Sequence, residues 1–223
     1  MKKLLIIVLG TFLFTTAKAQ VYVQGGLNLA NISTTNSGSV NKNNTLATFN
    51  AGILARSNSS GMLGVESGLL LDGRGAKAER GSGNASYKVT FNPLYLELPV
   101  NLIVRLPMGS GANIFINGGP YIAMGIAGKS KFDGQLGAIS GSHTETIKFT
   151  SADPTADDQA YSKLKRYDYG LNIGAGVDLK KILLKVNYGY GLAKINSMQT
   201  DNNTNEKDKY RTLSISLGIP LTH

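Results

Sequence analysis

The chain has no cysteine and no tryptophan among its 223 residues, and its two histidines are His143 and His223. The lack of cysteine excludes disulfides and thiolate sites, so stability must come from packing and backbone pairing. A histidine metal site needs a cluster of such residues, and these two are far apart in the sequence. We therefore expect neither a metal nor another cofactor.

The chain also lacks a long apolar run beyond its first 20 residues. No later stretch approaches the roughly 18 consecutive apolar residues that a membrane helix needs. The first 20 residues, MKKLLIIVLGTFLFTTAKAQ, join two early lysines to an apolar core and to Ala-Lys-Ala at 17–19. This pattern predicts a Sec signal peptide over residues 1–19 and one exported all-β domain over residues 20–223.

Charge of one sign is only mildly in excess. Removal of three lysines with the predicted signal peptide leaves 20 of the 23 basic residues against 14 acidic residues, a net charge of +6. The sequence has no basic helix and no stripe of alternating basic and aromatic residues, so we exclude nucleic acid as a partner. A mild positive charge is compatible with anionic lipid headgroups or polysaccharide.

What the chain does contain is a series of segments with a period of two residues. In RYDYGLNIGAGVDL, residues 166–179, the odd positions are apolar or tyrosine and the even ones are Asp, Asn or Gly. Such alternation predicts strands and not helices. Eight strands are predicted, over residues 21–32, 46–56, 61–72, 94–106, 113–128, 167–179, 182–192 and 212–221.

The connections between these segments alternate between long and short. The long ones cover residues 33–45, 73–87, 129–165 and 196–208, and the short ones cover residues 57–60, 107–111 and 180–181. Successive turns of an up-and-down sheet lie at opposite ends, which predicts long extracellular loops and short periplasmic turns. The long segments are polar and aperiodic, as solvent-facing loops are. The longest, 129–165, is either a solvated loop or a surface for a ligand or partner.

The composition of the two strand faces decides between a soluble and a membrane barrel. A soluble lipocalin-like barrel needs an apolar interior and a charged exterior, whereas a barrel in lipid has an apolar exterior and a polar lumen. Here the second face is polar and rich in glycine, which suits the cramped interior of an eight-stranded barrel. We therefore predict an all-β, eight-stranded antiparallel transmembrane barrel, with a soluble ligand-binding barrel as the rival.

Polar residues on the predicted lumen face are candidates for a buried network. The network either fills the barrel and makes it rigid, or forms a path for protons or ions, and we favour the filled lumen because eight strands leave little room for water. Each charge should have a partner, since a half-paired buried charge is costly. The candidate residues are Glu66, Glu97, Asn101, Arg105, Asp168, Asn172, Lys185 and Asn187, with Arg56 as a further possibility.

Tyrosines and prolines give two more expectations. Tyrosines at 22, 95, 167, 169, 188, 190 and 210 are placed to include members of interfacial aromatic girdles, although Tyr22 and Tyr95 have the parity of the lumen. Pro99 and Pro120 lie inside predicted strands, where proline cannot donate to the ladder. We expect bulges at these two points.

Several short motifs in order resemble the PorT-like family, within the broad group of outer membrane protein beta-barrel domains. They are Tyr95-Leu96-Glu97-Leu98-Pro99, Gly119-Pro120-Tyr121-Ile122, Tyr167-Asp168-Tyr169-Gly170-Leu171, Gly174-Ala175-Gly176, Tyr188-Gly189-Tyr190-Gly191-Leu192 and Leu213-Ser214-Ile215-Ser216-Leu217-Gly218. The resemblance implies a Gram-negative outer-membrane barrel. Its name-giving member is tied to type IX secretion and gliding, but many relatives have no assigned role.

These observations favour a monomeric outer-membrane protein with a structural or cell-surface interaction role, in contact with lipid and with surface proteins. The alternatives are an accessory of a secretion or transport machine and an outer-membrane enzyme. For an enzyme, Ser140, Ser142 and His143 are near one another, but no acid is placed by sequence to orient the imidazole. We therefore predict no enzymatic activity.

Overall fold

The computed structural model describes residues 19–36, 39–42, 45–57, 61–82, 85–108, 111–136, 139–150, 163–179, 181–195 and 208–221. Residues 1–18 of the predicted signal peptide and most of the segment 196–208 thus lie outside the described residues. Within the described ranges, no helix is long and apolar enough to cross a membrane. The strands are β1 (Ala19–Asn36), β2 (Ser39–Lys42), β3 (Leu46–Ser57), β4 (Leu63–Gly73), β5 (Ala76–Ser82), β6 (Ala85–Pro107), β7 (Asn113–Leu136), β8 (Ile139–Thr146), β9 (Lys148–Thr150), β10 (Lys163–Lys165), β11 (Tyr167–Asp178), β12 (Leu183–Gly191) and β13 (Lys209–Pro220).

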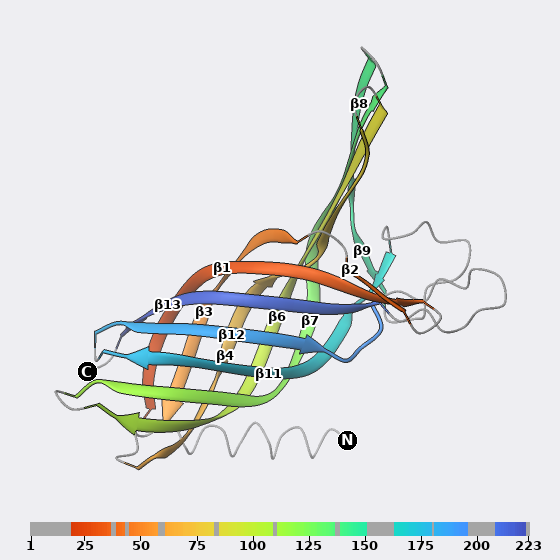
Figure 1. The fold of residues 1–223 in the computed structure, drawn as a ribbon. Helices are drawn as coiled ribbons and strands as arrows, with labels where there is room; N and C mark the ends of the chain where they lie inside the picture. Colours follow the sequence, from red (N-terminus) through yellow and green to blue (C-terminus); the bar gives the residue numbers. More distant parts are fainter. Residues whose placement is uncertain are drawn as a thin grey trace.

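Eight of these strands pair in a closed circuit (Figure 1). The order around the circuit is β1, β3, β4, β6, β7, β11, β12 and β13, with β13 paired to β1, and every pair is antiparallel. Strands next to each other in the circuit follow one another along the chain, which is up-and-down topology. The prediction of an eight-stranded antiparallel barrel is confirmed.

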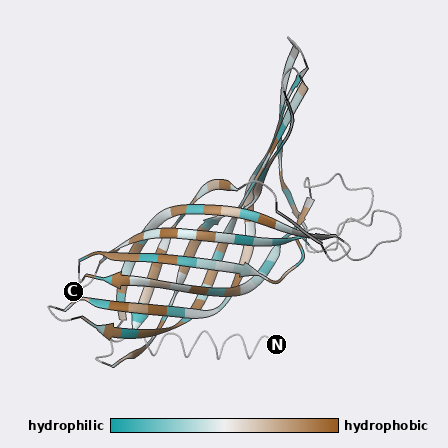
Figure 2. Cartoon of the chain, viewed as in Figure 1, coloured by the Kyte–Doolittle hydropathy of each residue, from teal (hydrophilic) through white to brown (hydrophobic). Residues whose placement is uncertain are grey.

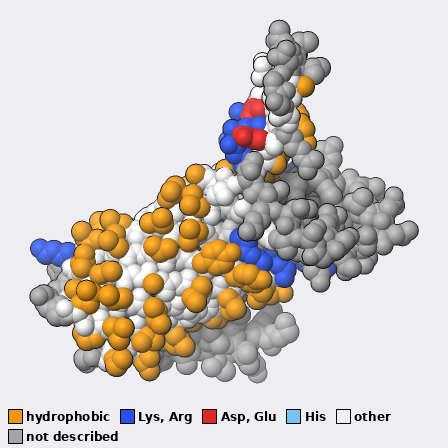
Figure 3. All heavy atoms as spheres, viewed as in Figure 1, with side chains coloured by type: hydrophobic (Ala, Val, Ile, Leu, Met, Phe, Trp, Pro, Cys, Tyr) orange, Lys and Arg blue, Asp and Glu red, His pale blue; other side chains and the backbone are white. Residues whose placement is uncertain are grey.

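The two faces of the strands follow the predicted parity. In β11, Asn172 is buried inside the ring, whereas its neighbours Leu171 and Ile173 are 51% and 67% exposed on the outside. Hydrophobic and hydrophilic residues alternate along the strands (Figure 2), and apolar side chains cover the visible outer surface of the barrel (Figure 3). The interior is therefore the polar side and the exterior is the apolar side, the reverse of a soluble barrel.

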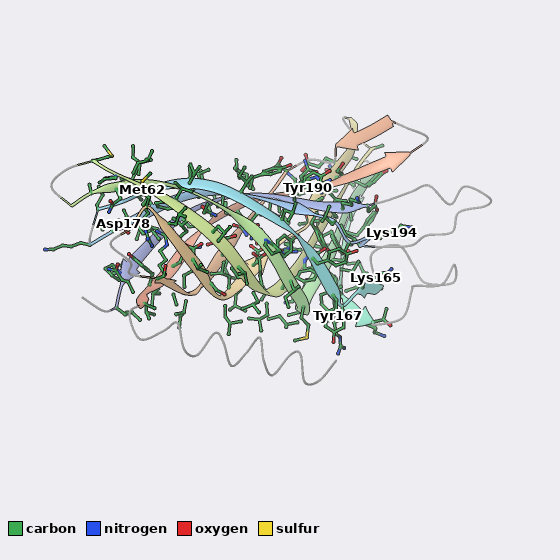
Figure 4. All side chains as sticks on the ribbon, turned by 90° about the horizontal axis from the view of Figure 1, so that it is seen from below. Met62, Lys165, Tyr167, Asp178, Tyr190 and Lys194 are labelled. Atoms are coloured by element: carbon green, nitrogen blue, oxygen red, sulfur yellow. The ribbon has the colours of Figure 1, made fainter. Side chains whose placement is uncertain are left out.

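The two ends of the barrel differ. Short connections join β3 to β4, β6 to β7 and β11 to β12 at one end, where β1 also pairs with the end of β13. Met62 and Asp178 lie at this end, and Tyr167 and Lys194 lie at the other (Figure 4). At the second end the described chain continues beyond the ring, in β2, β5 and β8 and in the ends of β6 and β7.

Three of the predicted long loops are wrong in detail, because strands continue through them. In the segment 33–45, β1 continues to Asn36 and pairs with β2. Most of the segment 73–87 belongs to β5 and the start of β6, and within 129–165 the described residues form the end of β7, β8, β9 and β10. Pairing of β5, β6, β7 and β8 builds a four-stranded sheet that projects beyond the barrel (Figure 1), which we call the projecting sheet. These segments are rich in Gly, Ser and Lys. Because this composition is typical of loops, it does not indicate the strands.

The prolines do not produce the predicted bulges. Pro99 pairs with Tyr121, and the β6–β7 register is the same on both sides of this pair. The hydroxyl of Ser67 donates to the Pro99 carbonyl at 2.7 Å. The register shift between β6 and β7 lies instead at Leu94/Tyr95, at the base of the projecting sheet.

Candidate functional site

The barrel lumen contains a cluster centred on the buried guanidinium of Arg74. Its Nε atom lies 2.6 Å from Asp72, and its two Nη atoms pair with Glu97 and Asp168. The rings of Tyr95, Tyr121 and Tyr210 surround the guanidinium, with centroids 5.0, 4.8 and 5.8 Å from its central carbon. Six side chains from five strands, β4, β6, β7, β11 and β13, thus converge on one cation.

Each of the three carboxylates in this cluster accepts a second hydrogen bond. Asn28 donates to Asp72 at 2.6 Å, Asn172 donates to Glu97 at 2.9 Å, and Tyr121 donates to Asp168 at 2.9 Å. These neutral donors matter because the cluster has three carboxylates against one guanidinium. Buried charges are tolerated only where hydrogen bonds replace water.

The backbone around Arg74 explains how its side chain reaches the lumen. β4 ends at Gly73, and the Arg74 amide donates to the Pro93 carbonyl at 2.9 Å. Gly75 has a positive φ of 127°, and a Cβ there would lie 1.9 Å from the Phe91 carbonyl oxygen. The chain therefore turns sharply after Arg74, from the barrel wall into the projecting sheet.

A second ionic cluster lies nearer the short turns. Glu66 is fully buried and pairs with Arg56 at 2.6 Å and with Lys185 at 2.5 Å, while Asn101 donates to it at 3.0 Å. The Arg56 guanidinium also lies 4.1 Å from the Phe115 ring centroid. One carboxylate thus pairs with a cation from the neighbouring strand β3 and with a second cation from β12, across the lumen.

Amides and hydroxyls lie between the two ionic clusters. Gln24 donates to Asn50, Asn50 donates to Asn28 at 2.6 Å, and Ser216 donates to Asn50 at 3.0 Å. The side chains here leave a cavity of about 30 Å³ lined by residues of both clusters, including Glu97 and Lys185. That space suits one or two water molecules.

Apolar side chains close the lumen beyond each cluster. At the short-turn end, Tyr22, Ile103, Phe115 and Leu183 form one buried cluster. At the other end, Tyr95, Tyr121 and Tyr210 pack with buried residues that include Ile147, Leu164 and Ile195. The polar centre of the barrel is therefore enclosed between two apolar layers.

The eight candidate residues fall in three groups. Glu97, Asp168 and Asn172 belong to the Arg74 cluster, and Glu66, Asn101 and Lys185 belong to the Arg56 cluster. Arg105 is only half-buried and donates to the Ser57 carbonyl at 2.7 Å, and Asn187 meets Asn117 at 3.2 Å. Glu97 and Arg105 share a face, as expected, but do not pair.

Sequence reasoning missed Arg74 and Asp72, the centre of the first cluster. The sequence predicts a solvent-facing loop at residue 74, because the segment 73–87 is polar and aperiodic. The alternation of the strand could have identified Arg74. Residues 66, 72 and 74 are all even-numbered, and even-numbered residues share one face of an alternating strand. Tyr210 was also misplaced: it is buried in the lumen and does not belong to an outer girdle.

The projecting sheet carries the residues that were weighed as catalytic. Ser140 and Ser142 share one face of β8, and His143 lies on the other face, where its Nε2 atom is 3.3 Å from Glu145. Alternate residues of a strand point to opposite faces, so Ser142 and His143 do not form a nucleophile and base pair.

A closed antiparallel ring with an apolar outside and a polar, filled inside is the architecture of a membrane-spanning barrel. Residues 15–197 match the family model described as outer membrane protein beta-barrel domain. The chain belongs to this family. As an outer membrane protein beta-barrel domain, it resides in the outer membrane of a Gram-negative cell, and its exposed apolar band faces lipid.

Solved structures of other outer-membrane proteins have similar folds. The attachment invasion locus protein Ail of Yersinia pestis is 15% identical, with 92% of this chain and 99% of that chain covered and a TM-score of 0.41. Neisserial surface protein A is 12% identical, with coverages of 90% and 97% and a TM-score of 0.38. OprG from Pseudomonas aeruginosa is 12% identical, with coverages of 93% and 98% and a TM-score of 0.38. No curated protein matches the chain significantly.

Proposed function

We propose that this outer-membrane barrel is a monomeric, non-enzymatic protein with a structural or cell-surface interaction role, and that it is not an open pore. The observation that carries the proposal is the enclosure of the lumen. Two ionic clusters, the amides between them and an apolar layer at each end occupy the interior. An eight-stranded ring has an interior just wide enough for such side chains.

The lumen network acts as a rigid internal frame in this proposal. Arg74 joins β4, β6 and β11, and Glu66 joins β3, β4 and β12, so the two clusters brace the circuit from within. Such a frame holds the barrel in one shape and leaves the extracellular parts to meet partners. The projecting sheet is the part best placed for this, because strands extend it well beyond the apolar band.

Conductance in planar lipid bilayers tests the closed lumen. We expect no steady ionic current from the purified protein, and Arg74→Ala combined with Glu66→Ala should not open a pore unless the apolar layers also move. A stable single-channel current from the unaltered protein would overturn the proposal. The folded state is checked by the change in gel mobility on boiling.

Shortening the projecting sheet tests the interaction role. Joining Lys77 to Thr90 and Lys129 to Thr146 through short Gly-Ser turns removes the sheet and keeps the barrel strands. We expect loss of binding to host or neighbouring cells with an intact, heat-modifiable barrel. Unchanged binding would exclude the sheet, and stoichiometric co-purification of secretion components would favour the accessory role instead.

A further inference from the structure

The outer surface of the barrel continues without a break into one face of the projecting sheet. In the barrel part of β6 the even-numbered residues, such as Leu98 and Leu96, face lipid. In the projecting sheet the even-numbered residues Asn92, Thr90 and Lys88 continue the same face. In β7 the bulge opposite Leu94/Tyr95 shifts the phase by one residue. Directly paired residues share a face. We call this continuous surface the outer face of the sheet.

The chemistry of this surface changes abruptly where the sheet leaves the barrel. Below the bulge the outward side chains are Leu, Ile, Val and Met, and above it they are Lys, Thr, Ser, Asn, Gln, Asp and Glu. The outer face of the sheet consists of Lys77, Glu79, Ser86, Lys88, Thr90, Asn92, Lys129, Lys131, Asp133, Gln135, Ser140, Ser142, Thr144 and Thr146. An apolar surface that turns basic and polar at one level marks the boundary between acyl chains and headgroups.

The opposite face of the sheet has a different character. It continues the lumen side of the barrel and bears Phe91, Val89, Tyr87 and Phe132, with the last two rings stacked at 6.1 Å. The sheet is thus polar on the side that continues from lipid and partly aromatic on the side that continues from the lumen.

The projecting sheet bends away from the barrel axis, so that its outer face points back toward the outer surface of the barrel. Bulges bend the strands that contain them, and the β6–β7 bulge lies at the base of the sheet with the positive-φ Gly75 nearby. In Figure 3 the charged side chains of the projection lie on the side over which the barrel extends, and apolar side chains lie on the opposite side. Since the bilayer surrounds the barrel's apolar band, the charged side faces the bilayer surface.

The charges on the outer face favour an anionic partner. The outer face has four lysines and two acids, Glu79 and Asp133, which gives a net charge of +2. The acids pair with two of the lysines: Lys77 lies 2.7 Å from Glu79, and Lys131 lies 2.9 Å from Asp133. A hollow of about 660 Å³ on this face is lined by Lys88, Ser86 and Ser142 and also by both carboxylates, Glu79 and Asp133. The ammonium groups of the four lysines on this face suit the phosphate groups of a lipid surface.

We propose that the outer face of the projecting sheet binds, through its four lysines, the phosphate-bearing headgroups of lipids in the surrounding outer leaflet. Contact with lipid on this face leaves the opposite face, with Tyr87 and Phe132, directed away from the cell. The partner is the membrane in which the barrel already sits, so binding orients the sheet and requires no other protein.

Adjacent residues of β8 provide a matched test, because the chain has no native cysteine to interfere. A nitroxide label is placed on Thr144→Cys, on the outer face, or on His143→Cys, on the opposite face. Collision with a water-soluble nickel chelate is measured in nanodiscs of phosphatidylglycerol and of phosphatidylcholine. We expect a several-fold lower collision rate at position 144 than at position 143, in the anionic lipid above all.

Lysine replacement completes the test. Lys88→Gln, Lys129→Gln and Lys131→Gln together should remove the protection at position 144, while Lys181→Gln, at the other end of the barrel, should not change it. Equal collision rates at the two positions in phosphatidylglycerol, or protection that survives the triple replacement, would overturn the proposal. The nanodiscs contain no cell-surface partner, so that failure would leave the proposed cell-surface role untouched.

Discussion

The guanidinium of Arg74 pairs with the carboxylate of Asp168, a residue 94 positions later in the chain. The first residue follows β4 and the second lies near the start of β11, so the contact crosses the lumen and links the base of the projecting sheet to the far wall. Neither side chain has bulk water to stabilise its charge. Their pairing therefore stabilises the closed barrel.

Removal of Arg74 tests this dependence. Arg74→Ala leaves three carboxylates without their cation, and breaking a buried ion pair from one side costs on the order of 3–5 kcal/mol. We expect a lower midpoint of urea unfolding, followed by tyrosine fluorescence in detergent or lipid. Arg74→Lys should recover only part of the loss because a single ammonium cannot reproduce the planar fork of the guanidinium. Wild-type stability in Arg74→Ala would show that the cluster is not part of the frame.

Two consecutive glycines predict opposite outcomes for the same substitution. A Cβ on Gly119 would lie 2.0 Å from the Val100 carbonyl oxygen, whereas a Cβ on Gly118 would meet only the Asn172 carbonyl oxygen at 3.4 Å. Gly119→Ala should therefore destabilise the barrel by about 1–3 kcal/mol through overpacking. Gly118→Ala should stay near wild type in the same unfolding experiment, and similar losses in both variants would contradict the assigned faces.

A charge on the lipid-facing side tests the orientation of the barrel. Leu102 is 69% exposed on the outer surface of β6. Leu102→Arg should destabilise the folded, inserted protein by about 2–4 kcal/mol if the residue lies near the bilayer midplane. Thr144→Arg, on the projecting sheet, is the control and should fold normally. Equal yields of heat-modifiable protein from the two variants would argue against lipid contact at Leu102.

Acid should strengthen the contact between the sheet and anionic lipid. Hydrogen bonds from Lys77 and Lys131 hold the pKa values of Glu79 and Asp133 below their usual range. Both carboxylates stay charged until the pH falls through those lowered values, and their pairing with lysine is lost only then. Below that point the outer face changes from a net charge of +2 to +4, with its four lysines unopposed.

The collision rate of the label at position 144 reports this change. We expect it to fall further as the pH drops below about 4, the usual value for these carboxylates, in phosphatidylglycerol but not in phosphatidylcholine. Lipid phosphate keeps its charge in this range. A rate that rises on acidification, with the barrel still folded by gel mobility, would contradict the assignment of Glu79 and Asp133 to the lipid-facing side.

The interior network illustrates what local pattern can and cannot reveal. Parity alone placed Glu66 and Asn172 on one side of their strands, because alternation is a property of each strand by itself. It could not pair Glu66 with Lys185, since that contact depends on which strands face each other across the closed ring. The sequence does not predict that Arg74 lies in the lumen. The position of its side chain depends on a turn, and the glycines of that turn are also typical of a loop.

The sequence by itself determined the number of barrel strands, their up-and-down order and the side of each that is apolar, because these follow from period-two alternation and from the spacing of turns. Only the tertiary structure decided which charges neutralise one another and where the strands leave the barrel to form the projecting sheet. Those features depend on register and on closure, which bring together residues from distant parts of the chain, and no single strand carries that information.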